Sequence, residues 1–315
     1  MAGARLVDIH PNLVKSLSAP EDHFGEFKPH VPPLGSYSTL QFVLRLRPDV
    51  HEVLNRSGTG VRLSSDVSQE AKEAFSTYLH ETIHWWQHCG TTTGLMLSFL
   101  QPAHAHVNRE KLEKVLAEHG PRKSLLQLAE KLVADSPDAL HGSTALSYVL
   151  NTWHDLDYFS RLVLDPKATV DAVVNSPSFV GVGHAYFTAM SATVWMISSS
   201  VDPQLVTLPD PRHFAALEEG LRDQRVEGFY PDSPIKLPPI GAKHIFEGQA
   251  RFSQIQYLHG TSNGHLTWQE IRAAKMLEGV YVEAFAQFLM MIRQSWPSTV
   301  DHPLVGLFLL ICDLS

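Results

Sequence analysis

The chain has 315 residues and a formal net charge of −8, from 25 lysines and arginines against 33 aspartates and glutamates. This mild acidity argues against a general nucleic-acid binder, which needs a basic face. The two cysteines, Cys89 and Cys312, are too few for a disulfide framework or a cysteine-rich zinc site. The sequence shows no signal-peptide layout and no apolar run that would span a bilayer. We therefore expect a cytoplasmic protein that binds neither nucleic acid nor membrane.

The N-terminal part combines an extended segment with strand-like residues. Residues 1–37 are rich in proline and glycine and predict an arm wrapped over the domain. Thr39–Arg47 alternates apolar and polar residues, which is the period of a β-strand. A second short strand is expected at Gly60–Leu63. The apolar side of the first strand would carry Leu40, Phe42, Leu44 and Leu46.

Residues 66–90 predict a long helix. Asp66 would be its N-cap, with Gln69 reaching back to form a capping box, and Gly90 would end it. Trp85 is expected to pack rather than to bind substrate. A stripe at helical spacing is expected to face the core, and it consists of Ala71, Ala74, Phe75, Tyr78, Thr82 and Trp86.

The same helix carries the motif His-Glu-x-x-His at residues 80–84. Residues four apart share one face of a helix, so the imidazoles of His80 and His84 can bind one metal ion. Glu81 lies one residue further round, where its carboxylate can act as a general base on a metal-bound water. His88 continues the spacing, but each step of four residues drifts by about 40° around the helix. We therefore expect a zinc-peptidase centre in which His88 is not a ligand.

The chain after Gly90 is predicted to be helical up to a proline-rich connection. The segment at 184–199 is rich in small and apolar residues and is expected to be buried. Residues 230–241 contain four prolines and predict an extended connection between subdomains. The expected helices are Thr93–Ala105, Asn108–His119, Lys123–Ala134, Ser143–Leu164 with Ser143 as its cap, Val170–Val174, His184–Ser199 and Pro211–Arg225.

Two more helices and a final apolar run complete the chain. Lys243–Leu258 predicts one helix. Thr267 and Glu270 predict a capping box that opens a long helix to about Ser295. The apolar run Pro303–Cys312 stops three residues before the end of the chain. This favours a natural sequence that continues further.

A catalytic zinc site needs a third protein ligand, and Glu247 is the preferred candidate. It is followed by a small residue and, three positions later, by an alanine, so its helix can pack closely against the motif helix. Residues 80–84 and 244–251 together resemble the ligand helices of gluzincin metallopeptidases. The longer gap between them here is expected to hold a helical insertion. The resemblance implies Glu81 as the general base and a zinc ion bound by His80, His84 and Glu247.

Several roles have competing candidates. Glu283 has the same Glu-x-x-Ala form and is the reserve third ligand, and Asp155 with Asp157 is a weaker reserve. Glu247 could instead be the ion-pair partner of Arg251 one turn later. A peptidase also needs a donor for the tetrahedral oxyanion. The sequence leaves this donor open among Tyr257, His259, Tyr281 and His184.

The whole chain predicts a mainly α fold with a small N-terminal β-sheet (α+β). Residues 38–315 would form a single zincin-like domain with a helical insertion at about 91–228. The predicted reaction is hydrolysis of a peptide or amide bond in a peptide or protein substrate. One alternative is a di-iron carboxylate protein using Glu81 and His84, although that fold typically needs two Glu-x-x-His helices and one is found. The other is an inactive zincin-fold binding or regulatory module. Substrate identity, endo- or exopeptidase action and oligomeric state stay open.

Overall fold

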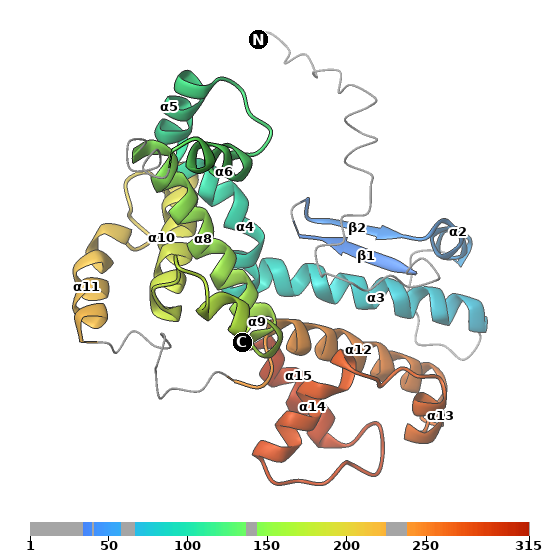
Figure 1. Ribbon diagram of the computed structural model, residues 1–315. Helices are drawn as coiled ribbons and strands as arrows, with labels where there is room; N and C mark the ends of the chain where they lie inside the picture. The colour runs from blue at the N-terminus through green and yellow to red at the C-terminus, as the bar shows by residue number, and fades with distance from the viewer. Residues whose placement is uncertain (1–33, 40, 58–66, 137–143, 225–237, 315) are drawn as a thin grey trace. The chain divides into compact units, whose positions relative to one another are not determined.

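The computed structural model describes residues 34–39, 41–57, 67–136, 144–224 and 238–314, and Figure 1 shows their arrangement. The predicted mainly helical chain with a small N-terminal sheet is confirmed. Among the described helices, none combines the length and the apolar character that crossing a membrane requires. The elements are β1 (Gly35–Ser38), β2 (Val43–Leu46), α2 (Pro48–Ser57), α3 (Gln69–Gly90), α4 (Thr92–Val107), α5 (Arg109–His119), α6 (Leu125–Asp135), α8 (Thr144–Leu164), α9 (Pro166–Val174), α10 (Val182–Val201), the 3-10 helix η1 (Pro211–Phe214), α11 (Ala215–Asp223), α12 (Ala242–Thr261), α13 (Trp268–Ala273), α14 (Val280–Met291) and α15 (Pro303–Asp313).

The sheet is an antiparallel hairpin rather than one long strand. β2 occupies the second half of the predicted strand, and it pairs with β1 so that Gly35 faces Leu46 and Ser38 faces Val43. The described residues before β2, at positions 39, 41 and 42, form a turn, and Phe42 has a left-handed backbone with φ of 51°. Residues 35–37, expected in the extended arm, therefore belong to the sheet. Residues 1–33 of the arm and the predicted strand at 60–63 lie outside the described residues.

Helix α3 begins later than the sequence pattern predicted. Its N-cap is Ser68, whose hydroxyl accepts a hydrogen bond from the backbone N–H of Ala71 at 3.2 Å. The predicted cap, Asp66, lies outside the described residues and two positions before the observed cap. The end at Gly90 is confirmed. The chain then turns sharply into α4. The turn brings Gly94 so close to α3 that a Cβ atom there would lie 2.1 Å from the carbonyl oxygen of Gln87.

The predicted apolar stripe of α3 does not face the core throughout. Tyr78 is 40% exposed and Trp86 is 51% exposed, and Trp85, which was expected to pack, is 42% exposed. The buried face includes the polar residues Ser76, Thr77, His80, Glu81, Gln87 and His88. Helix α12 lies beside α3 (Figure 1) and meets this face with hydrogen-bonding side chains, so polar groups are buried there with partners.

Helices α4 to α10 follow the prediction closely and have hydrophobic clusters of their own. α4, α8, α9 and α10 share a cluster that includes Leu100, Phe159 and Val173. The expected burial of α10 is confirmed for its small residues. It is wrong for Trp195, which is 40% exposed. Two predicted features, the cap at Ser143 and most of the proline-rich connection, lie outside the described residues.

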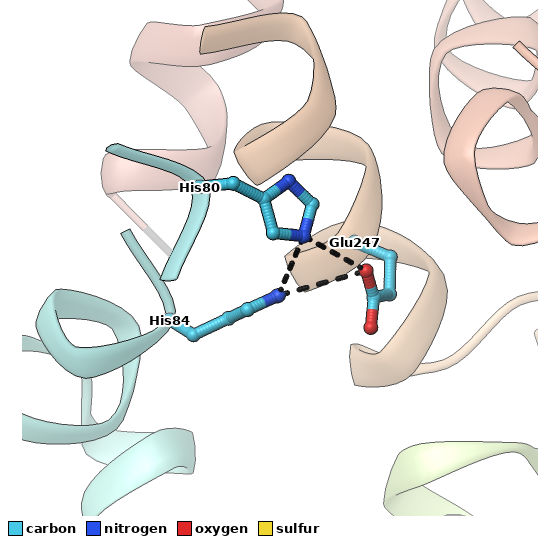
Figure 2. A group of neighbouring side chains, drawn as sticks. All are labelled: His80, His84 and Glu247. Carbon is cyan, nitrogen blue, oxygen red and sulfur yellow. Dashed lines mark hydrogen bonds and ion pairs between the residues drawn. The ribbon is translucent and has the colours of Figure 1, made fainter. Parts of the chain in front are cut away.

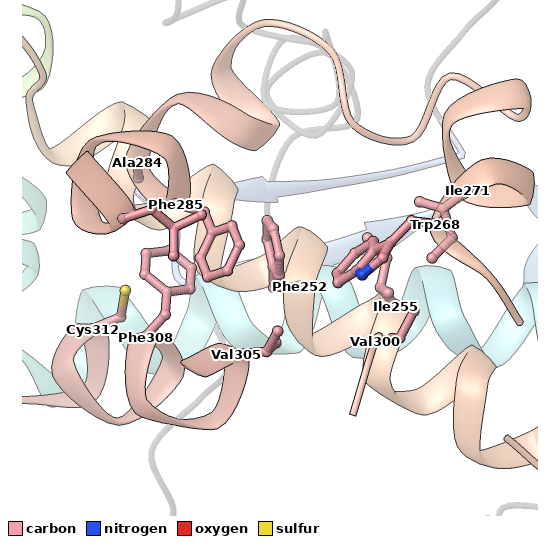
Figure 3. Packing of buried hydrophobic residues seen from close by; sticks show 11 residues of the cluster. Phe252, Ile255, Trp268, Ile271, Ala284, Phe285, Val300, Val305, Phe308 and Cys312 are labelled. Atoms are coloured by element: carbon pink, nitrogen blue, oxygen red, sulfur yellow. The ribbon is translucent and has the colours of Figure 1, made fainter. Parts of the chain in front are cut away.

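The long helix predicted from Thr267 to about Ser295 is wrong. The capping box is present, since Thr267 Oγ1 accepts from the Glu270 backbone and Glu270 accepts from the Thr267 backbone. The helix nevertheless ends at Ala273, and Lys275 and Gly279 adopt left-handed backbone conformations with φ of 56° and 53°. This break lets α13 and α14 both pack against α12 around one aromatic core, which Figure 3 shows.

Phe252 of α12 lies at the centre of this aromatic core. It is fully buried, and its ring centroid lies 4.5 Å from that of Phe285 and 5.4 Å from that of Phe308. Replacing it with alanine removes these contacts and leaves a cavity, so we expect Phe252→Ala to lower the free energy of unfolding by about 3–5 kcal/mol. Urea unfolding measures this change. Leu310→Ala, at a position that is 54% exposed, is the matched control and should change stability by less than about 0.5 kcal/mol. Equal losses would contradict the assigned core.

Candidate metal centre

The structure brings His80, His84 and Glu247 together, as Figure 2 shows. The two histidines project from successive turns of α3, and the glutamate projects from α12. Both helices are held at this point by side chains of their facing polar surfaces. Gln87 of α3 donates hydrogen bonds to the Phe246 carbonyl and to Gln249 of α12. In the described part of the chain, this is the one group of three or more His, Cys, Asp or Glu residues whose ligand atoms converge.

The spacing of the three donor atoms fits one metal ion. The Nε2 atoms of His80 and His84 are 3.1 Å apart, and Glu247 Oε2 lies 3.5 Å from each of them. Zinc bonds of about 2.0–2.1 Å in a tetrahedral arrangement place two donor atoms about 3.3–3.4 Å apart. By contrast, 3.5 Å is long for an N–H···O hydrogen bond. Glu247 Oε2 is accordingly a buried atom without a hydrogen-bond partner among the described residues. The donor set therefore fits a metal ion.

The charges of the three residues depend strongly on one another. Burial alone would raise the pKa of the Glu247 carboxyl, but the facing imidazoles of His84 and His80 hold that pKa well below its usual range. Burial would lower the pKa of His84, but the Glu247 carboxylate outweighs it and raises the pKa to about 9. For His80, burial prevails and lowers the pKa to about 4. At pH 7 the metal-free group thus holds a carboxylate, an imidazolium and a neutral imidazole.

The protonation states of these three residues predict how metal binding depends on pH. A histidine must be neutral to bind zinc, so the proton on His84 has to leave. We expect zinc binding at pH 7 to release about one proton, and the affinity to rise about tenfold per pH unit until about pH 9, the pKa of His84. Calorimetric titration of the metal-free protein in two buffers of different ionisation enthalpy measures the proton count. An affinity that does not change between pH 7 and pH 9 would contradict this charge assignment.

Glu81 follows His80 in the chain but is not one of the three converging donors. It is 7% exposed, and burial raises the pKa of its carboxyl to about 7. Its charge interacts with those of His84, Glu247 and Arg251. Strand β1 passes directly over it, since a Cβ atom at Gly35 would lie 2.6 Å from Glu81 Cγ and 2.9 Å from Oε1. The absence of a side chain at Gly35 thus leaves room for the Glu81 carboxyl.

Of the four predicted oxyanion donors, Tyr281 lies near the three converging metal-ligand candidates. Its ring centroid is 6.2 Å from that of His80, and burial together with the Glu247 charge raises the pKa of its hydroxyl. The guanidinium of Arg251 lies over the Tyr281 ring, 4.1 Å from its centroid, and donates to Gln254 at 2.5 Å. Arg251 thus packs on Tyr281, whereas the ion contacts of Glu247 are with the two histidines. The sequence predicts Arg251 only as an ion-pair partner of Glu247. Its position one helical turn after Glu247 is the sequence signal that it lies close to the three donors.

The other three oxyanion candidates lie elsewhere. Tyr257 contacts Phe75, with ring centroids 4.9 Å apart. His259 Nδ1 lies 2.9 Å from the carbonyl oxygen of Leu266 and holds the turn after α12. His184 lies between Asp155 and Glu218, 3.3 Å and 3.2 Å away.

The reserve metal ligands are also engaged away from the group. Glu283 is 51% exposed at its side chain and lies 3.4 Å from His244 Nε2. Asp155 faces His184, and Asp157 forms an ion pair with Arg161 at 2.8 Å. His88 is buried, and its Nδ1 lies 3.2 Å from Ser98 Oγ, while burial lowers the pKa of its imidazole to about 4.

Comparisons of this chain with protein-family models, with curated proteins and with solved structures find no match in any of the three. What the group does has to be inferred from its geometry and from its donor atoms.

Proposed function

We propose that the protein is a zinc-dependent metallopeptidase with a zincin-like catalytic core of the gluzincin kind. The observation that carries this proposal is the convergence of His80, His84 and Glu247 at tetrahedral donor spacing, with the next residue after His80, Glu81, also buried. Two imidazoles and one carboxylate form a donor set that catalytic zinc sites use. Zinc would be held by those three residues.

The chain's own residues supply the remaining chemistry. A zinc ion held in this site would polarise a carbonyl group and lower the pKa of a water molecule bound to it. Glu81, which is buried and next to the first histidine ligand, is the general base that takes the proton from the attacking water. The same carboxyl then returns the proton to the leaving amine. Its contact with the backbone of Gly35 restricts the positions that its carboxyl can take.

Tyr281 is the proposed donor to the tetrahedral oxyanion. The charges of Glu247, Arg251 and Glu81 act on its hydroxyl, which supports this role. A tyrosine hydroxyl is protonated at neutral pH, and burial raises the pKa of this one further, so it can donate a hydrogen bond. Arg251 holds the ring through its stacked guanidinium and adds positive charge near the oxyanion.

The di-iron alternative lacks support in the described residues. Such a centre needs further carboxylates around the Glu81–His84 helix, and Glu283, the reserve metal ligand, lies against His244. The described part of the chain therefore holds one group of possible metal ligands, and not the two that a di-iron centre would need.

Peptide hydrolysis with a metal requirement tests the proposal. The purified protein would be stripped with a chelator, reloaded with zinc and incubated with a mixture of peptides of diverse sequence. We expect new peptide termini, detected by mass spectrometry, with zinc-loaded protein and none with stripped protein. The positions of the cuts would also distinguish an endopeptidase from an exopeptidase. Zinc-loaded protein that cleaves no peptide or amide in the mixture would overturn the proposal.

A further inference from the structure

Gln87 of α3 is almost fully buried, with 1% exposure, although its side chain is a polar amide. All of its polar atoms have partners. Its Oε1 lies 2.8 Å from His84 Nδ1, and its Nε2 lies 2.9 Å from the carbonyl oxygen of Phe246 and 2.8 Å from Gln249 Oε1. A buried amide with three good contacts has a defined place and orientation.

The orientation of the Gln87 amide follows from the Phe246 carbonyl. A backbone carbonyl can only accept a hydrogen bond, so the amide nitrogen of Gln87 must face it. The amide oxygen of Gln87 then faces His84 Nδ1, and it too can only accept. His84 must therefore carry a hydrogen on Nδ1. In the neutral imidazole this leaves the lone pair on Nε2, which is the atom that faces His80 and Glu247.

Gln87 also connects the two helices that supply the donor atoms. Phe246 is the residue before Glu247, so one side chain fixes both the His84 ring and the backbone next to the glutamate. Gln249, 3% exposed, extends the connection by donating to Asp313 of α15 at 2.5 Å. The same amide thus sets the tautomer of one donor and the position of another.

We propose that Gln87 is a positioning residue of the metal centre, which holds His84 as the Nδ1–H tautomer and fixes α12 at Glu247. This inference rests on the proposed metal site but not on the peptidase reaction. Hydrogen-bond partners of ligating histidines typically change metal affinity by 10–100-fold when they are removed. Gln87 should therefore affect zinc affinity without touching zinc or substrate.

The test is a zinc titration of Gln87→Met, of similar length but without hydrogen-bonding groups. We expect it to bind zinc about 10–100-fold more weakly than the unmodified chain. The slowly exchanging His84 Nδ1–H proton, seen by NMR in the zinc-loaded protein, should be lost. Gln256→Met is the matched control, because Gln256, on α12, likewise donates to a backbone carbonyl, that of Val300 at 2.6 Å, but away from the metal centre. It should keep the affinity and the Nδ1–H signal.

The outcomes separate this inference from the proposed function. If the unmodified chain binds no zinc, both fail. If it binds zinc and Gln87→Met matches it within twofold, or keeps the Nδ1–H signal, the positioning role alone is overturned. If Gln87→Met does not fold, Gln87→Asn takes its place, since it keeps a polar amide but is too short to reach all three partners. An unchanged zinc affinity in Gln87→Asn would overturn the role equally.

Discussion

Glu81→Gln is expected to lower peptide hydrolysis by about 10²–10⁴-fold, the usual contribution of a general base, while zinc content stays unchanged. The substitution keeps the size of the side chain and its place under Gly35. It removes the group that exchanges a proton with water and with the leaving amine. Because Glu81 is not one of the three converging donors, the metal should still bind. Steady-state hydrolysis of a cleaved peptide, with zinc measured on the same sample, gives both numbers.

Glu73→Gln is the control for this experiment. Glu73 lies on the same helix, is exposed, and accepts a hydrogen bond from Gln69 at 2.9 Å. It should leave both hydrolysis and zinc content unchanged. Hydrolysis by Glu81→Gln at the rate of the unmodified chain would exclude Glu81 as the base. This result would revive the interpretation of the chain as a binding or regulatory module.

Removing Glu247 is expected to have the largest effect on metal content. Glu247→Ala leaves two histidines as donors, and we expect zinc affinity to fall by more than the roughly 100-fold that indirect partners can account for. The carboxylate also raises the pKa of His84, so its loss should abolish most of the proton release on any residual binding. Zinc content after gel filtration, measured by atomic emission, tests the prediction directly.

Glu283→Ala provides the comparison, because Glu283 shares the Glu-x-x-Ala form and faces His244 instead. It should keep full zinc content, and His80→Ala should lose it as Glu247→Ala does. Zinc lost with Glu283→Ala and retained with Glu247→Ala would show that the wrong glutamate has been assigned to the centre.

Local patterns in the sequence place the two histidines of the converging group better than they predict the packing around it. The spacing of His80 and His84 is a property of one helix, so the pair could be placed without any tertiary information. The same applies to the capping box at Thr267 and to most helix ranges. Glu247 needed a resemblance to known ligand helices, because nothing local indicates which of several glutamates meets α3.

The failures have a common physical origin in contacts between distant segments. Tyr78 and Trp86 were assigned to the core by their apolar character, yet they are exposed because α12 covers the polar face of α3 instead. Tyr281 could not be chosen over Tyr257, because its position depends on the backbone break at Lys275 and Gly279. Apolar periodicity in the sequence continues a helix through such a break. The break is required by the aromatic core around Phe252, which residues of both α13 and α14 join.

The contact of Gln87 with the Phe246 carbonyl spans 159 residues of sequence. Synthesis at about 5–20 residues per second leaves roughly 8–30 s between the appearance of the two partners. During that interval the paired histidines exist without Glu247 and without the amide contacts that orient His84. Contacts between such distant residues also form late in folding, because a long loop must close first. The three donor atoms can therefore come together only after the 162 residues between His84 and Glu247 have been synthesised.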